Sequence, residues 1–310
     1  MKKIIVLMLA FAALFGCTPK IGAQSAEKAD LKKLEQNLQK RFSQQDENAK
    51  VKVKVKELKN LNDILPGFSF VEVQIYSNDV LAKTDRLITN GQYFTNELID
   101  SSLFSSLKDE LEFEFSKPVA INTDNLTLAG GKKNAKNVII EITDFQCPYC
   151  KKANSYFVDA LKDKSDYALY IVHLPLTGMH PSAEVMAQIF EAGMLMGKNF
   201  KNELFGADYL SALEKKANEM KEQGVKLNQE LVDNLIKEFN QSIIDEYAAK
   251  TDDPAKFKEL VNSDEVKSKI TATKNLASSL NIDSTPVFYI NGKAVSGFNE
   301  GLIAKAIENF

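Results

Sequence analysis

The sequence has few cysteines, no tryptophan and no long run of basic residues. Three cysteines among 310 residues exclude a scaffold held together by disulfides, so their sulfur atoms must serve another purpose. The 39 Lys and Arg residues against 42 Asp and Glu residues give a net charge of −3, which argues against binding to nucleic acid. Glycine-rich nucleotide loops and flavin fingerprints are missing too, so we expect no cofactor. With 44% apolar and 26% charged residues, the chain is expected to fold.

The N-terminal residues have the pattern of an export signal. Lys2 and Lys3 precede an apolar run from Ile4 to Phe15, which is too short to span a bilayer. The run ends in Leu14-Phe15-Gly16-Cys17, which resembles a bacterial lipobox and predicts a signal peptide over residues 1–16 and a lipid on Cys17. Ordinary cleavage after Ala23, giving a soluble protein, is the alternative. No later segment is long and apolar enough to span a membrane, so any membrane attachment is expected through lipid alone.

Residues 17–45 are predicted to hold the anchor and an amphipathic helix. Leu31, Leu34, Leu38 and Phe42 are spaced three and four apart, which places them on one helical face. The narrow stripe suits packing within the chain or contact with a second copy, and the sequence leaves both open.

Residues 46–121 are predicted to form a small α+β module that could serve in dimerisation. Valines at 51, 53 and 55 alternate with lysines and predict a strand near a sheet edge. Asn90-Gly91 predicts a hairpin with a two-residue turn, and Leu111 to Phe115 alternates as a further strand. Residues 122–136, which include Gly130-Gly131, are predicted to be a linker.

A cysteine pair follows the next predicted strand. Val138 to Ile142 is an apolar, β-branched run, and Cys147-Pro148-Tyr149-Cys150 then leads into a predicted helix from about 151 to 162. The first N–H groups and the dipole of a helix stabilise an anion at its start, so Cys147 is predicted to be the nucleophilic thiolate. Cys150, one turn further on, is placed to attack a mixed disulfide at Cys147 and is predicted to be the resolving thiol.

Zinc binding and an inert disulfide are the two other interpretations of this pair. Zinc would need two more ligands, and the spacing of His173 and His180 fits no common zinc finger. An inert disulfide would close a loop too small to stabilise the fold much. We therefore expect redox chemistry and no metal. His173, in an apolar stretch, is expected to be a hydrogen-bonded core residue, and His180 precedes Pro181 at a helix start.

Three segments together resemble a known family. They read EITDFQCPYCKK from Glu141, HPSA from His180 and STPVFYINGK from Ser284. In this order they are similar to the thioredoxin-fold disulfide oxidoreductases of the bacterial envelope, the DsbA, DsbC and DsbG group. The resemblance covers about residues 132–310 and implies an α/β thioredoxin-like catalytic domain over 137–310. Amphipathic helical patterns predict a large helical insertion over 181–280.

The resemblance also implies roles for further residues. Thr285-Pro286 is implied to be a cis peptide bond beside the cysteines, where the backbone at Thr285 receives the substrate strand. Pro148 and Tyr149, between the two cysteines, are expected to contact substrate as well. Glu141 matches the buried acid of the family and is implied to relay the proton of Cys150. The alternative is a Glu141 that simply faces water.

The function implied is dithiol–disulfide exchange on exported, cysteine-containing proteins, in the cell envelope facing the periplasm. The helical insertion and the HPSA segment favour a DsbA-like oxidase that a DsbB-like membrane partner reoxidises, and this is the function we expect. Pro148-Tyr149, Thr285 and a module able to form a homodimer favour instead a DsbC- or DsbG-like isomerase or reductase, kept reduced by a DsbD-like donor. A redox-inert, lipid-anchored holdase is the alternative from another class.

Overall fold

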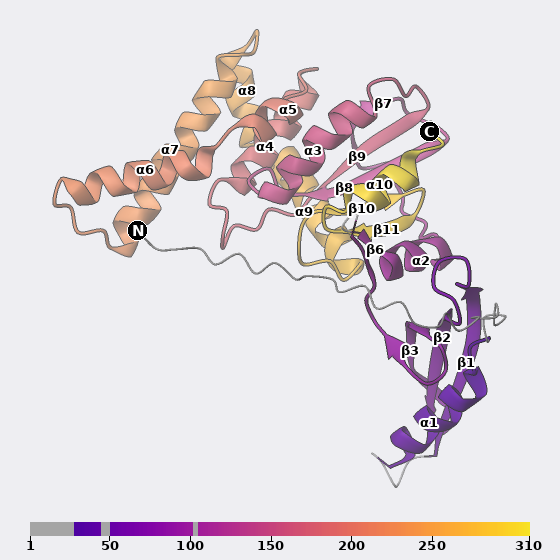
Figure 1. The fold of residues 1–310 in the computed structure, drawn as a ribbon. Coiled ribbons are helices and arrows are strands. Elements are labelled where there is room, and N and C mark those ends of the chain that lie inside the picture. The colour runs from indigo at the N-terminus through magenta and orange to yellow at the C-terminus, as the bar shows by residue number, and fades with distance from the viewer. Residues whose placement is uncertain (1–27, 45–49, 102–104) are drawn as a thin grey trace, which may run out of the picture. The chain divides into compact units, whose positions relative to one another are not determined.

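The computed structural model describes residues 28–44, 50–101 and 105–310 (Figure 1). The predicted signal peptide and Cys17 lie outside the described residues. The chain divides into two compact units, 1–96 and 97–310. Within the described ranges, no helix has both the length and the apolar character needed to cross a membrane.

The first unit is a four-stranded antiparallel sheet with one helix. The sheet has the order β1-β2-β3-β4, and the helix α1 packs on β1. The bounds are α1 Leu31–Ser43, β1 Val51–Asn60, β2 Ser69–Ser77, β3 Val80–Thr89 and β4 Phe94–Thr95. Leu34 of the helix is buried in one cluster with Val53, Val71 and Leu87 of the sheet, so the apolar stripe of α1 packs within its own chain.

Side chains of α1 also cover the outer edge of β1. The Gln39 side-chain amide donates to the Val51 carbonyl oxygen at 2.6 Å and its oxygen accepts from the Val53 N–H at 2.7 Å. The Glu35 carboxylate accepts from the Val55 N–H at 2.8 Å. The prediction of an edge strand here is confirmed. Side chains of the helix form hydrogen bonds with backbone groups of β1 that face away from β2.

The hairpin at Asn90-Gly91 has a wider turn than predicted. Ile88 pairs with Thr95 and Thr89 with Phe94, so the loop holds four residues and the predicted two-residue turn is wrong. The Asn90 side-chain oxygen accepts the N–H groups of residues 92 and 93 and thereby stabilises the wider loop. Gly91 has φ +92°, and a Cβ there would lie 2.3 Å from the backbone oxygen of residue 30.

The segment before the second sheet is organised differently from the prediction. The helix α2, Leu107–Phe115, replaces the strand predicted at 111–115, which is wrong. Ser106 caps this helix by accepting the Asp109 N–H at 3.3 Å, and acidic residues in the first turn stabilise it further. These two effects outweigh the strand preference of the five alternating residues. The short strands β5 Ile99–Asp100 and β6 Ser105–Ser106 precede it. Residues 97–121 group with the second unit, so the boundary lies earlier than the predicted 121.

The second unit contains a five-stranded sheet of order β11-β10-β8-β9-β7. Its strands are β7 Thr127–Gly131, β8 Asn137–Thr143, β9 Tyr167–His173, β10 Val287–Ile290 and β11 Lys293–Ser296. β8 and β9 are parallel, and the other neighbours are antiparallel. The linker predicted over 122–136 is wrong, because its middle is the edge strand β7, which pairs with β9. The two glycines that suggested a linker lie in this strand after a register shift.

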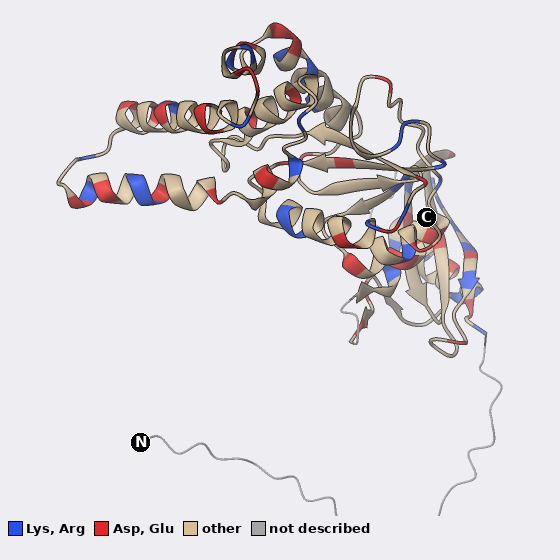
Figure 2. Cartoon of the chain, turned by 90° about the horizontal axis from the view of Figure 1, so that it is seen from above, with Lys and Arg blue, Asp and Glu red and all other residues tan. Residues whose placement is uncertain are grey.

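Helices cover the sheet and form the predicted insertion. Their bounds are α3 Pro148–Ala160, α4 Ala183–Leu195, α5 Lys201–Gly206, α6 Tyr209–Glu222, α7 Gln229–Ala248, α8 Pro254–Val261, α9 Asp264–Ser279 and α10 Glu300–Ile307. The helices α4 to α9 occupy the predicted insertion, which is confirmed. Helices α6 and α7 run side by side and extend away from the sheet in both views, and acidic and basic residues alternate with others along them (Figures 1 and 2).

Alternation along β8 separates two faces of the sheet. Ile140 and Ile142 pack in a cluster with Ala277 of α9. Ile139 packs on the opposite face against α3 and α10, so Glu141 and Thr143 share that face with it. This alternation places a carboxylate beneath the start of α3, where the cysteine pair lies.

Candidate active site

The two cysteines lie where β8 passes into α3. Cys147 is the N-cap residue of the helix, Pro148 begins it, and the Cys147 N–H donates to the Asp144 carbonyl oxygen at 3.1 Å. Both sulfur atoms are free thiols. Cys147 is 5% exposed and Cys150 is fully buried, so only the first can be approached by another protein.

The environment makes the two thiols chemically unlike. A hydrogen bond from the Cys150 side chain outweighs burial and, with the backbone N–H groups of Cys150 and Tyr149 and a contact to Thr285, lowers the pKa of Cys147 to about 5. Burial, together with the negative charge of Cys147, raises the pKa of Cys150 far above its ordinary value. Cys147 is therefore a thiolate at neutral pH, and Cys150 keeps its proton. This asymmetry supports the roles predicted from the sequence.

Thr285 and Pro286 lie beside the nucleophile. Their peptide bond is cis, as the resemblance implied. Cys147 Sγ is 3.5 Å from the Thr285 carbonyl oxygen, so the backbone before β10 borders the reacting sulfur. Pro148 is exposed and Tyr149 is 58% exposed, which leaves both open to an approaching chain.

Glu141 is fully buried, so the alternative in which it faces water is wrong. Lys201 Nζ, on α5, lies 3.0 Å from Glu141 Oε2, although neither carboxylate oxygen makes a well-directed hydrogen bond. Lys201 also donates to Asn154 Oδ1 of α3 at 2.8 Å. Sequence reasoning missed Lys201, because nothing in the local pattern of α5 distinguishes it from a surface lysine.

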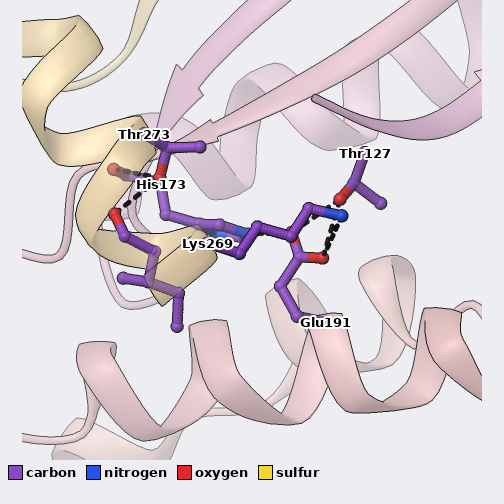
Figure 3. Close-up of polar contacts among 6 residues, drawn as sticks. Thr127, His173, Glu191, Lys269 and Thr273 are labelled. Atoms are coloured by element: carbon purple, nitrogen blue, oxygen red, sulfur yellow. Dashed lines mark hydrogen bonds and ion pairs between the residues drawn. The ribbon is translucent and has the colours of Figure 1, made fainter. Parts of the chain in front are cut away.

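His173 belongs to a buried polar cluster (Figure 3). It pairs with Thr143 across β8 and β9 and so lies on the same face of the sheet as Glu141. Its Nε2 is 2.7 Å from Glu191 Oε1. Thr127 donates to both Glu191 oxygens at 2.8 and 2.7 Å, and Lys269 Nζ is 3.0 Å from Oε2. Thr273 donates to the His173 carbonyl oxygen at 3.3 Å. The expectation of a hydrogen-bonded core histidine is confirmed.

This cluster stabilises the ionised form of the Glu191 carboxylate. Burial alone would raise the pKa of Glu191, but the hydrogen bond and charge of His173, the charge of Lys269 and the Thr127 hydroxyl outweigh it and lower the pKa to about 2. The carboxylate thereby connects β7, β9, α4 and α9.

His180 contacts the turn that leads to Cys147. Its Nδ1 is 2.8 Å from Asp144 Oδ2, and the pair is buried. In the part of the chain that the structure describes, no group of three or more His, Cys, Asp and Glu residues is arranged to hold a metal ion.

Comparisons with known proteins agree with this geometry. A protein-family model described as thioredoxin matches residues 123–308. Probable disulfide bond formation protein D of Bacillus anthracis is 24% identical over 166 residues, which are 52% of this chain and 68% of that protein. Na(+)/H(+) antiporter NhaA 1 of Mycolicibacterium vanbaalenii is 27% identical over 179 residues, which are 57% of this chain. That alignment spans only 24% of the antiporter's length. A second match, to Na(+)/H(+) antiporter NhaA 3 of Salinispora tropica, spans 10% of that protein.

Solved structures are similar to part of the chain. Oxidised BdbD of Bacillus subtilis is 22% identical, with a TM-score of 0.42, and the match covers 62% of this chain and 97% of that one. A thioredoxin-like oxidoreductase of Silicibacter pomeroyi is 19% identical, with a TM-score of 0.43, covering 61% and 96%.

Proposed function

This chain belongs to the thioredoxin family, and we propose that it catalyses dithiol–disulfide exchange on exported proteins, acting mainly as an oxidase that introduces disulfides. The observation that carries this proposal is the contrast between Cys147, with a pKa of about 5, and the buried, protonated Cys150. A stable Cys147 thiolate favours the reduced form of the pair, so the oxidised pair readily accepts electrons.

The oxidase reaction follows from the two thiols. In the oxidised enzyme, a substrate thiolate attacks Cys147 Sγ, a mixed disulfide forms, the Cys147–Cys150 bond breaks, and Cys150 takes up a proton. A second substrate thiolate then attacks the substrate sulfur of the mixed disulfide and releases Cys147 as a thiolate. The substrate loses two electrons and gains a disulfide, while the enzyme is left as the dithiol.

Substrate positioning and recycling are parts of the same proposal. The backbone at Thr285 and the exposed Pro148 and Tyr149 would align the substrate segment beside Cys147. Glu141, paired with Lys201, would relay the proton of Cys150. A DsbB-like membrane protein that carries a disulfide would reoxidise the pair, since the chain needs an electron acceptor.

The predicted signal peptide and Cys17 support a place in the bacterial envelope, attached by lipid and facing the periplasm. Disulfides persist in that compartment, which suits an enzyme that makes them. Mass analysis of the processed protein tests this part of the proposal, because a lipid on Cys17 and cleavage after Ala23 give different masses.

A specific observation favours a second candidate, a dimeric DsbC- or DsbG-like isomerase kept reduced by a DsbD-like donor. β4 pairs with β3 only at Ile88 and Thr89, and among the described residues β2 is the only strand that pairs with β3 from Val80 to Thr84, so the other edge of that stretch has no strand beside it. Val80 is 69% exposed and Leu81 is 49% exposed. An open apolar edge of this kind can pair with the same edge of a second copy.

The redox state of the cysteine pair in cells decides between the two candidates. Acid quenching and thiol alkylation of the processed protein should find Cys147 and Cys150 mostly oxidised for the oxidase and mostly reduced for the isomerase. A Cys147→Ser variant should lose all turnover. If the wild type shows no dithiol turnover and the Cys147→Ser variant still prevents client misfolding, only the holdase interpretation remains.

A further inference from the structure

The turn before Cys147 is fixed by one buried carboxylate. Asp144 Oδ1 accepts the Gln146 N–H at 2.7 Å. Asp144 Oδ2 accepts the Leu176 N–H at 2.8 Å and lies 2.8 Å from His180 Nδ1. The Asp144 carbonyl oxygen accepts the Cys147 N–H, so the same residue holds the turn by its main chain and its side chain. Asp144 thus sets where the helix of the nucleophile begins.

The segment 174–182, which leads from β9 into α4, holds this turn from one side. Besides the contacts of Leu176 and His180, the Ser182 N–H donates to Gln146 Oε1 at 2.7 Å. The segment is itself a compact turn, because the N–H groups of Met179 and His180 both donate to the Leu176 carbonyl oxygen at 2.9 Å. The start of the helical insertion is therefore bonded directly to the active-site turn.

His180 differs from the other donors to Asp144. The other two are backbone N–H groups, which persist whatever side chain is present, whereas the imidazole can be removed by substitution. The Asp144 side chain is 0% exposed and that of His180 is 10% exposed. Without the imidazole, a buried carboxylate keeps only its backbone donors, and the penalty of an incompletely bonded buried charge strains the turn.

We propose that His180 is a positioning residue for the exchange reaction: through Asp144 it holds the turn that presents the first N–H groups of α3 to the Cys147 thiolate. This inference rests on the proposed function, since it assigns a role within that reaction. The hydrogen bond of the His180 imidazole goes to Asp144, and one from Cys147 Sγ goes to Thr285, so the proposed effect of His180 passes through Asp144 and the turn.

The thiolate of Cys147 reports the effect directly. In the reduced protein, its ultraviolet absorbance is followed against pH for the wild type, His180→Ala and His180→Asn. We expect His180→Ala to raise the Cys147 pKa by about one unit, a roughly tenfold loss of thiolate in the acidic range, because the helix start is less well ordered. His180→Asn places an amide N–H where Nδ1 lies and should restore the wild-type pKa. The potential measured against glutathione should shift with the pKa.

Asn240→Ala is the matched control. The Asn240 amide donates to the Pro181 carbonyl oxygen at 3.3 Å, so this change loosens the same segment without touching Asp144. It should leave the Cys147 pKa unchanged. A folded His180→Ala protein with the wild-type pKa, or an equal shift in Asn240→Ala, would overturn the inference.

If the His180→Ala protein does not fold, a comparison of His180→Gln with His180→Asn tests the inference instead. His180→Gln carries its amide beyond the Nδ1 position and should show the raised pKa, whereas His180→Asn should not; equal values in the two would also overturn the inference. Failure of the proposed function has a separate signature, a wild-type protein whose Cys147 titrates as described but which shows no exchange with any dithiol.

Discussion

Lys201 Nζ lies 3.0 Å from Glu141 Oε2, and both side chains are buried at the base of the active site. Glu141 comes from the central strand β8, whereas Lys201 comes from α5 in the insertion. The pair therefore connects the catalytic sheet to the helices that were added to it. A buried ion pair of this kind is costly to break and much less costly to replace as a whole.

We predict that Lys201→Met lowers the free energy of unfolding by roughly 3–5 kcal/mol, because it leaves Glu141 as an unpaired buried charge. The double variant Glu141→Leu with Lys201→Met should recover most of this loss, since the two apolar side chains have similar volumes to those replaced. Urea unfolding of both variants and of the wild type measures the difference. A single variant within about 1 kcal/mol of the wild type would contradict the prediction.

The pKa of Cys147 should depend on the side chain at position 150. The hydrogen bond from Cys150 is the largest cause of the low pKa of Cys147. Cys150→Ala removes this donor and should raise the Cys147 pKa by about one unit or more, whereas Cys150→Ser keeps a donor and should change it less. The pH dependence of alkylation by iodoacetamide measures both. A Cys147 pKa that stays at the wild-type value in both variants would mean that the helix start, and not Cys150, stabilises the thiolate.

Glu191 should stabilise the fold against acid. Its pKa is lowered from 4.5 to about 2 in the folded protein, so the unfolded chain binds a proton more tightly. This contribution, roughly 3 kcal/mol, is fully present above pH 4.5 and is lost as the pH falls toward 2.

Glu191→Gln keeps the shape of the side chain and removes its titration. The free energy of unfolding of the wild type should therefore fall more steeply than that of the variant between pH 4.5 and about 2. Denaturant titrations across this range measure both slopes. Parallel slopes would show that Glu191 is not the group responsible.

The open edge of β3 should support a dimer. Antiparallel pairing of two copies centred on Thr84 would set Lys83 of one copy opposite Asp85 of the other, two side chains that form an ion pair within a single chain. We predict that Leu81→Lys weakens self-association at least tenfold, because it places a charge at this edge. Sedimentation equilibrium measures the change.

Val158→Lys is the control for this experiment. Val158 is 47% exposed on α3, so the substitution adds the same charge on a helix of the other unit and not on β3, and it should leave self-association unchanged. A wild-type protein that is monomeric at all concentrations would rule out the dimer and with it the support for the isomerase.

Local patterns in the sequence were enough for much of the fold and for the cysteine pair. The β-branched run before Cys147 is a buried strand, and the capped, periodic segments of the insertion are helices, because hydrophobic periodicity and helix caps act over a few residues. Short ambiguous segments were predicted less well. Leu111 to Phe115 alternates like a strand but is helical, since the cap at Ser106 lies outside the five residues that alternate.

The sequence by itself determined that this chain carries a thiolate cysteine at a helix start, followed one turn later by its partner, in a thioredoxin-family domain. Only the tertiary structure decided which distant groups serve that pair. Lys201 beneath Glu141, and His180 on Asp144, come from the insertion and are brought to the site by long-range packing. Their electrostatic effect depends on distances of about 3 Å and on burial, which arise when the insertion folds onto the sheet and which no local pattern records.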